Sequence, residues 1–277
     1  MLGLRILSSV VIIPPVISSI WYGGYYYMAL IILVGGAIGW ELARLATARD
    51  GLVLVFNVIC MACTPVIAGY IGVIHGFIWI IIGVIGFAVI TRSHVQPTSE
   101  RISFALICAL GHLALLSLVW LRFGDARGAG IIFYVVMVIA ATDIGGYFVG
   151  NGIGGPKLAP RISPNKTWAG LIGGMALAGF AGFGFVKLLT LSGGWYPDEK
   201  ATAFLVETII LSVVLAPVAQ LGDLLESWIK RKRGAKDSGN LIPGHGGILD
   251  RVDGYLTAVP LVALITLIDK GGSFAWP

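Results

Sequence analysis

Acidic residues gather in one short stretch of an otherwise apolar chain. Eleven of its 33 charged residues fall in the 31 positions from Asp223 to Asp253. If the helix of the preceding apolar segment continues, Asp223, Ser227 and Lys230 lie on one face, at i, i+4 and i+7. Asp250 and Asp253 are three residues apart and share a face if the next helix begins there. Three converging carboxylates without soft ligands suit a hard cation such as Mg²⁺.

Basic residues surround these acids in the same stretch: Lys230, Arg231, Lys236 and Arg251. Around a cation, such side chains suit a polyphosphate. The glycine-rich turn at 243–247 lets backbone approach a ligand closely, and it carries His245, the only histidine in a polar, catalytic-looking context. This combination is typical of phosphoryl and nucleotidyl transfer, where positioning and charge neutralisation provide most of the catalysis. A solvated loop is the alternative interpretation of such a charge run.

A second polar patch follows the apolar segment at 128–150. Asp143 lies within that segment, and four polar residues precede the next one: Ser163, Asn165, Lys166 and Thr167. At a helix N-terminus these four side chains form an anion-binding site. Alternatively, Ser163 or Asn165 serves only as the N-cap of that helix.

The elements that must position these residues are membrane helices. Hydrophobic residues make up 57% of the 277 positions and charged residues 12%, which is too little charge to cover a soluble surface. Runs of about 20 apolar residues predict transmembrane helices. Nine candidates lie near 4–22, 25–41, 52–70, 72–91, 103–121, 128–150, 168–190, 202–221 and 254–269. The expected fold is all-α, a polytopic membrane helical bundle of about nine transmembrane helices.

The distribution of basic residues predicts the orientation. Fourteen of the 19 lysines and arginines sort to the side that holds the N-terminus and the loops at 151–167 and 222–253. Cytoplasmic loops carry such an excess, so both loops are expected in the cytoplasm, where they can share one pocket. The net charge of +5 is ordinary for a bacterial inner-membrane protein and does not imply nucleic acid as a partner.

Two regions are predicted within one membrane unit: N-terminal helices over 1–125 and a catalytic region over 126–277. Small residues four apart, at Gly35/Gly39 and Gly170/Gly174, permit close helix packing. Packing within the chain is favoured over a dimer seam. Cys60 and Cys63 form a C-x-x-C inside an apolar run, which favours buried small hydrophobes over redox chemistry or metal binding.

The residues of the charged stretch resemble a known family. Ser227-Trp-Ile-Lys-Arg231, Lys236-Asp-Ser-Gly239, Ile242-Pro-Gly-His-Gly-Gly-Ile248 and Asp250-Arg-Val-Asp253 reproduce the signature of the phosphatidate cytidylyltransferases. Leu221-Gly-Asp223, Ile162-Ser-Pro-Asn-Lys-Thr167 and the segment from Asp143 to Tyr147 are also similar to that family. The chain departs from it at Asn151 and Gly155, where the family often carries a basic residue.

The resemblance implies an inner-membrane enzyme that uses Mg²⁺ and CTP, with the identity of any second cation open. It would join CTP and phosphatidate into CDP-diacylglycerol and release pyrophosphate, and it would form a homodimer. The metal-binding acids would be Asp223, Asp250 and Asp253. Phosphate contacts would come from Ser227, Lys230, Arg231 and Lys166. The remaining candidate substrate contacts are Asp143, Ser163, Asn165, Thr167, Lys236, Asp237, His245 and Arg251.

Other function classes fit less well. A CTP-dependent polyprenol or phytol kinase has similar ingredients but a different signature. A transporter would distribute its buried acids through mid-span positions, whereas here they cluster at one membrane face. The sequence contains no Walker A motif, H-E-x-x-H or nucleophile elbow.

Two expectations concern stability. Lys230, at the end of a helix, is expected to contribute little packing. Asp250, as one of several carboxylates that repel one another without their cation, is expected to contribute little or unfavourably to folding.

Overall fold

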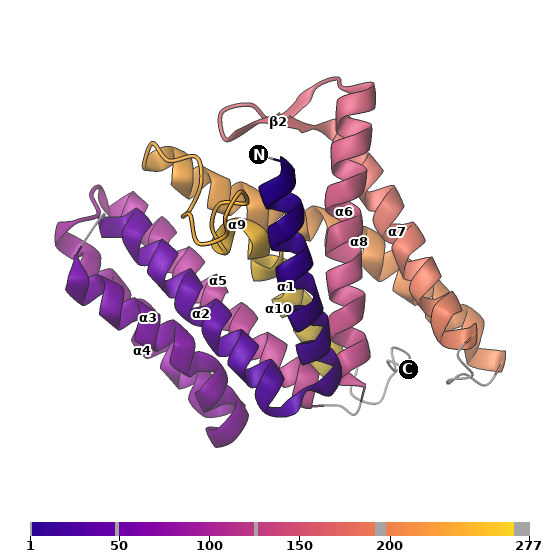
Figure 1. Cartoon of the computed structure of the whole chain (residues 1–277), viewed down its shortest axis with the longest axis horizontal. Coiled ribbons are helices and arrows are strands. Elements are labelled where there is room, and N and C mark those ends of the chain that lie inside the picture. The colour runs from indigo at the N-terminus through magenta and orange to yellow at the C-terminus, as the bar shows by residue number, and fades with distance from the viewer. Residues whose placement is uncertain (1, 48–49, 125–126, 192–197, 269–277) are drawn as a thin grey trace.

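A computed structural model describes residues 2–47, 50–124, 127–191 and 198–268 of the chain (Figure 1). Its helices are α1 (Leu2–Tyr22), α2 (Gly24–Thr47), α3 (Gly51–Val66), α4 (Val73–Ile90), α5 (Thr98–Phe123), α6 (Gly128–Ile153), α7 (Trp168–Leu191), α8 (Asp198–Lys232), α9 (Leu249–Val252) and α10 (Tyr255–Ile268). A π-helical turn, η1 (Ile67–Ile71), extends α3, and a 3₁₀ turn, η2 (Thr91–Ser93), follows α4.

The predicted membrane bundle is confirmed. Within the described residues, seven helical segments are long and apolar enough to cross a membrane, and two shorter apolar helices, Leu7–Tyr22 and Tyr255–Ile268, accompany them. The long segments are Gly24–Thr47, Gly51–Ile71, Val73–Ser93, Thr98–Phe123, Gly128–Ile153, Trp168–Leu191 and Thr202–Lys232. All nine coincide with the segments expected from hydropathy. An apolar run in lipid must satisfy its own backbone hydrogen bonds, and a helix does so.

The helices form two groups that meet along α1 and α10. In the first group α2 packs on α3 and α5, and α4 packs on α3 and α5. In the second, α7 lies between α6 and α8. Helix α10 contacts α5, α6 and α8, while α1 contacts α2 and α6 (Figure 1). The two groups therefore share these two helices.

Glycine pairs bring neighbouring helices into backbone contact. A Cβ atom at Gly39 would lie 2.6 Å from the carbonyl oxygen of Asn57 in α3, and one at Gly170 would lie 2.8 Å from that of Gly146 in α6. Gly35 and Gly174 make comparable approaches to Met61 and Thr142. Since these contacts all lie within the chain, the prediction of intramolecular packing is confirmed.

A short hairpin contains the two β-strands found in the described residues. Strand β1 (Lys157–Ala159) pairs antiparallel with β2 (Ser163–Thr167), with Lys157 opposite Thr167. Ser163 and Asn165 lie in β2, so the alternative interpretation, in which one of them is the N-cap of α7, is wrong. Thr167 caps α7 instead: its Oγ1 accepts a hydrogen bond from the Gly170 N–H at 3.0 Å.

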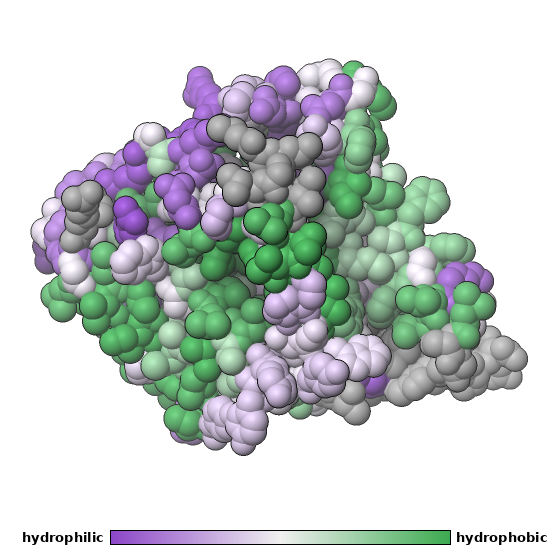
Figure 2. Space-filling view, viewed as in Figure 1, coloured by the Kyte–Doolittle hydropathy of each residue, from purple (hydrophilic) through white to green (hydrophobic). Residues whose placement is uncertain are grey.

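Polar residues collect at one end of the bundle. The hairpin, the start of α1 and the C-terminal end of α8 lie at the same end (Figure 1). Hydrophilic residues gather over this end, and hydrophobic ones cover much of the visible bundle beyond it (Figure 2). The candidate loops at 151–167 and 222–253 therefore lie together.

Candidate active site

Helix α8 carries the first part of the site. It continues to Lys232, as expected, and the turn that follows contains Gly234, whose φ of 64° suits glycine. Asp223, Ser227 and Lys230 share one face, and the Ser227 hydroxyl donates to Asp223 Oδ1 at 3.1 Å. The helical spacing predicted from the sequence is confirmed here.

One cluster of the site is rich in acids. Gly222 has no room for a side chain, because a Cβ atom there would overlap the carbonyl oxygen of Asp253. This close approach brings Asp223 beside Asp253. Lys166, next to the N-cap of α7, forms an ion pair with Asp223. Burial raises the pKa of the Asp253 carboxyl, and the nearby charges of Asp223 and Asp143 raise it further.

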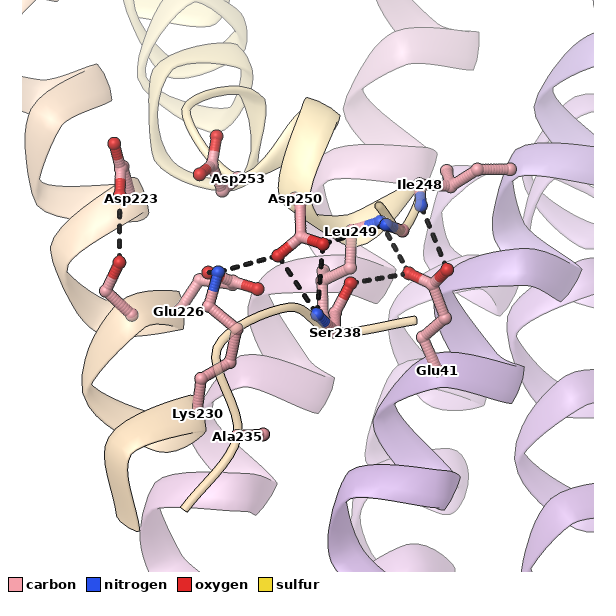
Figure 3. Close-up of polar contacts among 12 residues, drawn as sticks. Glu41, Asp223, Glu226, Lys230, Ala235, Ser238, Ile248, Leu249, Asp250 and Asp253 are labelled. Carbon is pink, nitrogen blue, oxygen red and sulfur yellow. Dashed lines mark hydrogen bonds and ion pairs between the residues drawn. The ribbon is translucent and has the colours of Figure 1, made fainter. Parts of the chain in front are cut away.

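A second cluster surrounds Asp250 and is rich in donors. Lys230 Nζ lies 2.6 Å from Asp250 Oδ1 and 2.5 Å from Glu226 Oε2. The side chains of Lys230, Glu226 and Asp250 are 9%, 1% and 6% exposed. The backbone N–H groups of Ser238 and Gly247 also donate to Asp250 (Figure 3). Burial alone would raise the pKa of Asp250, but the hydrogen bonds from Lys230 and Gly247 outweigh it and hold the pKa below its usual range.

Both stability expectations for these residues are therefore wrong. Lys230 is not an exposed lysine at a helix end, since it is enclosed between two buried carboxylates. Asp250 is not surrounded by repelling acids, since its nearest groups are donors. Hydropathy and helical spacing located both residues but could not show what the folded loop places against them.

The three predicted metal ligands are divided between the clusters. Figure 3 shows Asp250 turned toward Lys230 and Ser238, with Asp223 and Asp253 apart from it. In the part of the chain that the structure describes, no three histidine, cysteine or acidic side chains converge as a metal site. The charges of Asp223 and Asp143 act on Asp253, so these three acids form one group.

The glycine-rich turn folds back on itself. Ile242 N–H donates to Gly246 O at 2.9 Å, and Gly244 and Gly246 have φ angles of 78° and 83°, which favour glycine. His245 faces α1 rather than the acids: its Nδ1 lies 2.7 Å from Ser8 Oγ. The predicted polar turn is present, and its histidine serves as a link to the first helix.

Other predicted residues lie around the clusters. Arg231 Nε donates to Ile162 O at 3.2 Å, which connects α8 to the hairpin. Lys236 and Asp237 are exposed beyond the end of α8, Asn165 is exposed on β2, and Ser163 is half-buried. The structure therefore brings Lys166 to the acids, keeps Thr167 at the start of α7, and leaves Asn165, Lys236 and Asp237 facing outward.

Two buried acids were not predicted as site residues. Glu226 pairs with Lys230, and Glu41 of α2 accepts hydrogen bonds from Ser238, Ile248 and Leu249. Each lies in a long apolar helix, and an ionisable residue in such a helix is a functional candidate by default. That signal alone could have identified Glu41 from the sequence.

An apolar cavity of about 550 Å³ opens beside the site. Its walls come from α1, α2, α5, α6 and α10 and include Ile13, Leu30 and Phe133. His245 and Arg251, from the polar end, also line it. The cavity can hold hydrocarbon while Arg251 and His245 meet a polar headgroup.

The fold and site define a multi-span membrane protein with a charged site beside an apolar cavity. The family model described as "Cytidylyltransferase family" matches residues 3–268, and the chain belongs to that family. The chain is 47% identical to the phosphatidate cytidylyltransferase of Brucella suis biovar 1 over 162 residues, 58% of this chain and 54% of that protein.

Two further relatives carry the same name. The Bacillus subtilis protein is 41% identical over 138 residues, 50% of this chain and 48% of that protein. A Staphylococcus epidermidis protein is 34% identical over 189 residues, 67% of this chain and 68% of that protein. The chain thus spans about half the length of the first two relatives and about two thirds of the third.

Replacing Lys230 tests the buried ion pairs. We expect Lys230→Met to lower the free energy of unfolding by about 3–5 kcal/mol, because it leaves Glu226 and Asp250 buried without their cation. Thermal unfolding in detergent measures this. Lys232→Met is the matched control, since Lys232 is exposed and stacks on Trp228. Equal thermal midpoints for the two variants would contradict the enclosed position of Lys230.

Proposed function

We propose that the protein is a phosphatidate cytidylyltransferase, which transfers CMP from CTP to phosphatidate and yields CDP-diacylglycerol and pyrophosphate. The names of the relatives support this proposal. The main structural support for this proposal is that a charged site and an apolar cavity lie next to each other. The charged clusters of α8 and α9 adjoin an apolar cavity whose lining includes Arg251 and His245. Such a junction suits a lipid phosphate that must react with a water-soluble nucleotide.

The chemistry needs few groups. A phosphate oxygen of phosphatidate attacks the α-phosphorus of CTP, the bond to the bridging oxygen of the β-phosphate breaks, and pyrophosphate leaves with that electron pair. The attacking oxygen is already anionic at neutral pH, so no strong general base is required. Lys166 can neutralise phosphate charge, and Arg251 can orient the lipid headgroup. Lys230 remains a predicted phosphate contact, although here Glu226 and Asp250 enclose it.

We propose a Mg²⁺ requirement, and the donors fit it. Asp223 and Asp253 supply hard oxygen ligands, and Lys166 forms an ion pair with Asp223. The raised pKa of Asp253 reflects burial and crowding of negative charge, which a cation relieves. When bound, Mg²⁺ would neutralise charge developing on the phosphates. Asp250 remains the third predicted ligand, although here it faces Lys230.

A labelling experiment separates the proposal from a CTP-dependent lipid kinase. Purified protein in detergent receives Mg²⁺, CTP labelled on either the α- or the γ-phosphate, and one acceptor, which is phosphatidate, a polyprenol or phytol. We expect lipid product labelled only from the α-position, because the transferred group is CMP. Transfer of the γ-label to a polyprenol or phytol would favour the kinase, and no labelled lipid from any of these acceptors would overturn both assignments.

Asp253→Asn tests the acidic cluster. We expect turnover at saturating CTP to fall about 10²–10³-fold, since the amide is a poor metal ligand and a weakly held metal ion neutralises the phosphate charge of the transition state less well. Folding should be preserved or improved, because one of the crowded negative charges is removed. Glu100→Gln, which removes a carboxylate from the first turn of α5, is the control. Turnover of Asp253→Asn within about threefold of wild type would remove Asp253 from the site.

We also propose that the protein lies in the bacterial inner membrane with the site facing the cytoplasm. The excess of basic residues on the loops at 151–167 and 222–253 supports this orientation. Binding of CTP requires it as well, since the nucleotide arrives from the cytoplasm. A homodimer, implied by the family resemblance, remains a prediction.

Cysteine labelling tests the orientation. In a variant without Cys60, Cys63 and Cys108, we expect Asn240→Cys to react with an impermeant thiol reagent only after the inner face is opened. Tyr25→Cys, in the 82% exposed position beside the turn between α1 and α2, should react in intact cells. The reverse pattern would place the site outside and contradict the proposed function.

A further inference from the structure

Glu41 is a buried carboxylate that contacts the loop at residues 238–249, which lies far from it in the sequence. It lies near the C-terminal end of α2 and is 1% exposed. Its Oε1 accepts from the Ile248 N–H at 2.9 Å, and its Oε2 accepts from the Leu249 N–H at 2.7 Å. The Ser238 hydroxyl also donates to Oε2, at 2.9 Å (Figure 3). Both oxygens are therefore used, and all three donors belong to residues 238–249.

The loop is shaped around this carboxylate. A Cβ atom at Gly239 would lie 2.6 Å from Glu41 Oε1, and its next nearest atoms are also those of Glu41. One at Gly247 would lie 2.5 Å from Glu41 Oε2 and would overlap Ser238 Oγ. Neither glycine has a positive φ, so glycine is required by close approach and not by backbone conformation: Gly239 approaches Glu41, and Gly247 approaches Glu41 and Ser238.

The same loop residues hold Asp250. The Ser238 N–H donates to both oxygens of Asp250, at 3.1 and 3.0 Å, and the Gly247 N–H donates at 2.8 Å. Ser238 thus binds Glu41 through its hydroxyl and Asp250 through its backbone. A displacement of the loop from Glu41 would move the donors that orient Asp250 against Lys230.

We infer that Glu41 is a positioning residue for the active site: it holds residues 238–249 in the shape that presents Asp250 to Lys230. The inference rests on the proposed function for its catalytic consequence. It assigns a helix of the N-terminal region, 1–125, to the machinery that the signature residues form. Among the described residues no lysine or arginine forms an ion pair with Glu41. The loop donors therefore hold this buried carboxylate, which favours a closed loop.

Glu41→Gln is the most conservative test. The amide keeps the size of the side chain, but in either orientation its NH₂ group faces a loop donor. We expect the backbone amides of 238–249 to exchange hydrogen about tenfold or more faster in mass spectrometry of the full-length protein, with the thermal midpoint little changed. Glu100→Gln, the same chemical change at the start of α5, should leave that exchange unchanged.

Kinetics test the positioning role. We expect Glu41→Gln to lower kcat about 10- to 100-fold and to raise the KM for CTP by less, because misplaced groups weaken the transition state most. A double-mutant cycle adds a second arm. Gly239→Ala should lower kcat in the wild type but add little in a Glu41→Ala background, since the atoms nearest its Cβ are then gone.

The outcomes are distinguishable. If the amides of residues 238–249 exchange hydrogen in Glu41→Gln at the wild-type rate, the inference is overturned. Faster exchange with an unchanged kcat overturns it as well. Fully additive effects of Gly239→Ala and Glu41→Ala overturn the contact on which it depends. If the unsubstituted protein transfers no CMP, the proposed function fails. Even then, two measurements decide whether Glu41 holds the loop. They are the hydrogen exchange of Glu41→Gln and the Gly239→Ala/Glu41→Ala double-mutant cycle read out by thermal midpoint.

Discussion

The structure depends on the burial of charge at one face of the membrane. Lys230 lies between Glu226 and Asp250, and none of the three side chains is more than 9% exposed. Groups this deeply buried must be satisfied by one another, because unpaired charge is very costly away from water. That requirement explains why α8 continues beyond its apolar segment and why the loop after it returns to the helix. The polar end of the protein is organised by this need and not by hydrophobic packing.

The clusters around Asp250 and Asp253 differ in their electrostatic surroundings. Around Asp250 the protein provides donors, so that carboxylate is held ionised and in one place. Around Asp253 it gathers acids with Lys166 paired to one of them. A cation suits the acid-rich cluster around Asp253 more than the cluster around Asp250, because Lys230 and the backbone N–H groups of Ser238 and Gly247 already bind the Asp250 oxygens. The predicted set of three metal-binding acids therefore contains two different environments, which an analysis of residue types alone treats as one.

Hydropathy predicted the membrane helices because every span must satisfy its backbone internally, a constraint that acts locally and is visible in composition. Helical spacing placed Asp223, Ser227 and Lys230 on one face for the same local reason. The partners of Asp250 and Glu41 could not be predicted in this way. Glu41 meets Ser238 and Leu249 across about two hundred positions of sequence, and nothing in either segment specifies the other. The hairpin was missed because Ser163–Thr167 has no alternating apolar pattern.

The loop that completes the charged site also reaches the apolar cavity. His245 binds Ser8 of α1, and both His245 and Arg251 line the cavity that α1 helps to enclose. Arg251 lies six residues after His245. It directly follows Asp250, which faces Lys230. One short segment thus has one side toward the apolar cavity and the other toward buried charge. Its backbone also donates to Glu41 on α2 through Ile248 and Leu249, so the cavity wall, the charged cluster and the N-terminal helices meet at one loop. The proposed function needs such a junction, because a lipid phosphate and a nucleotide must meet there.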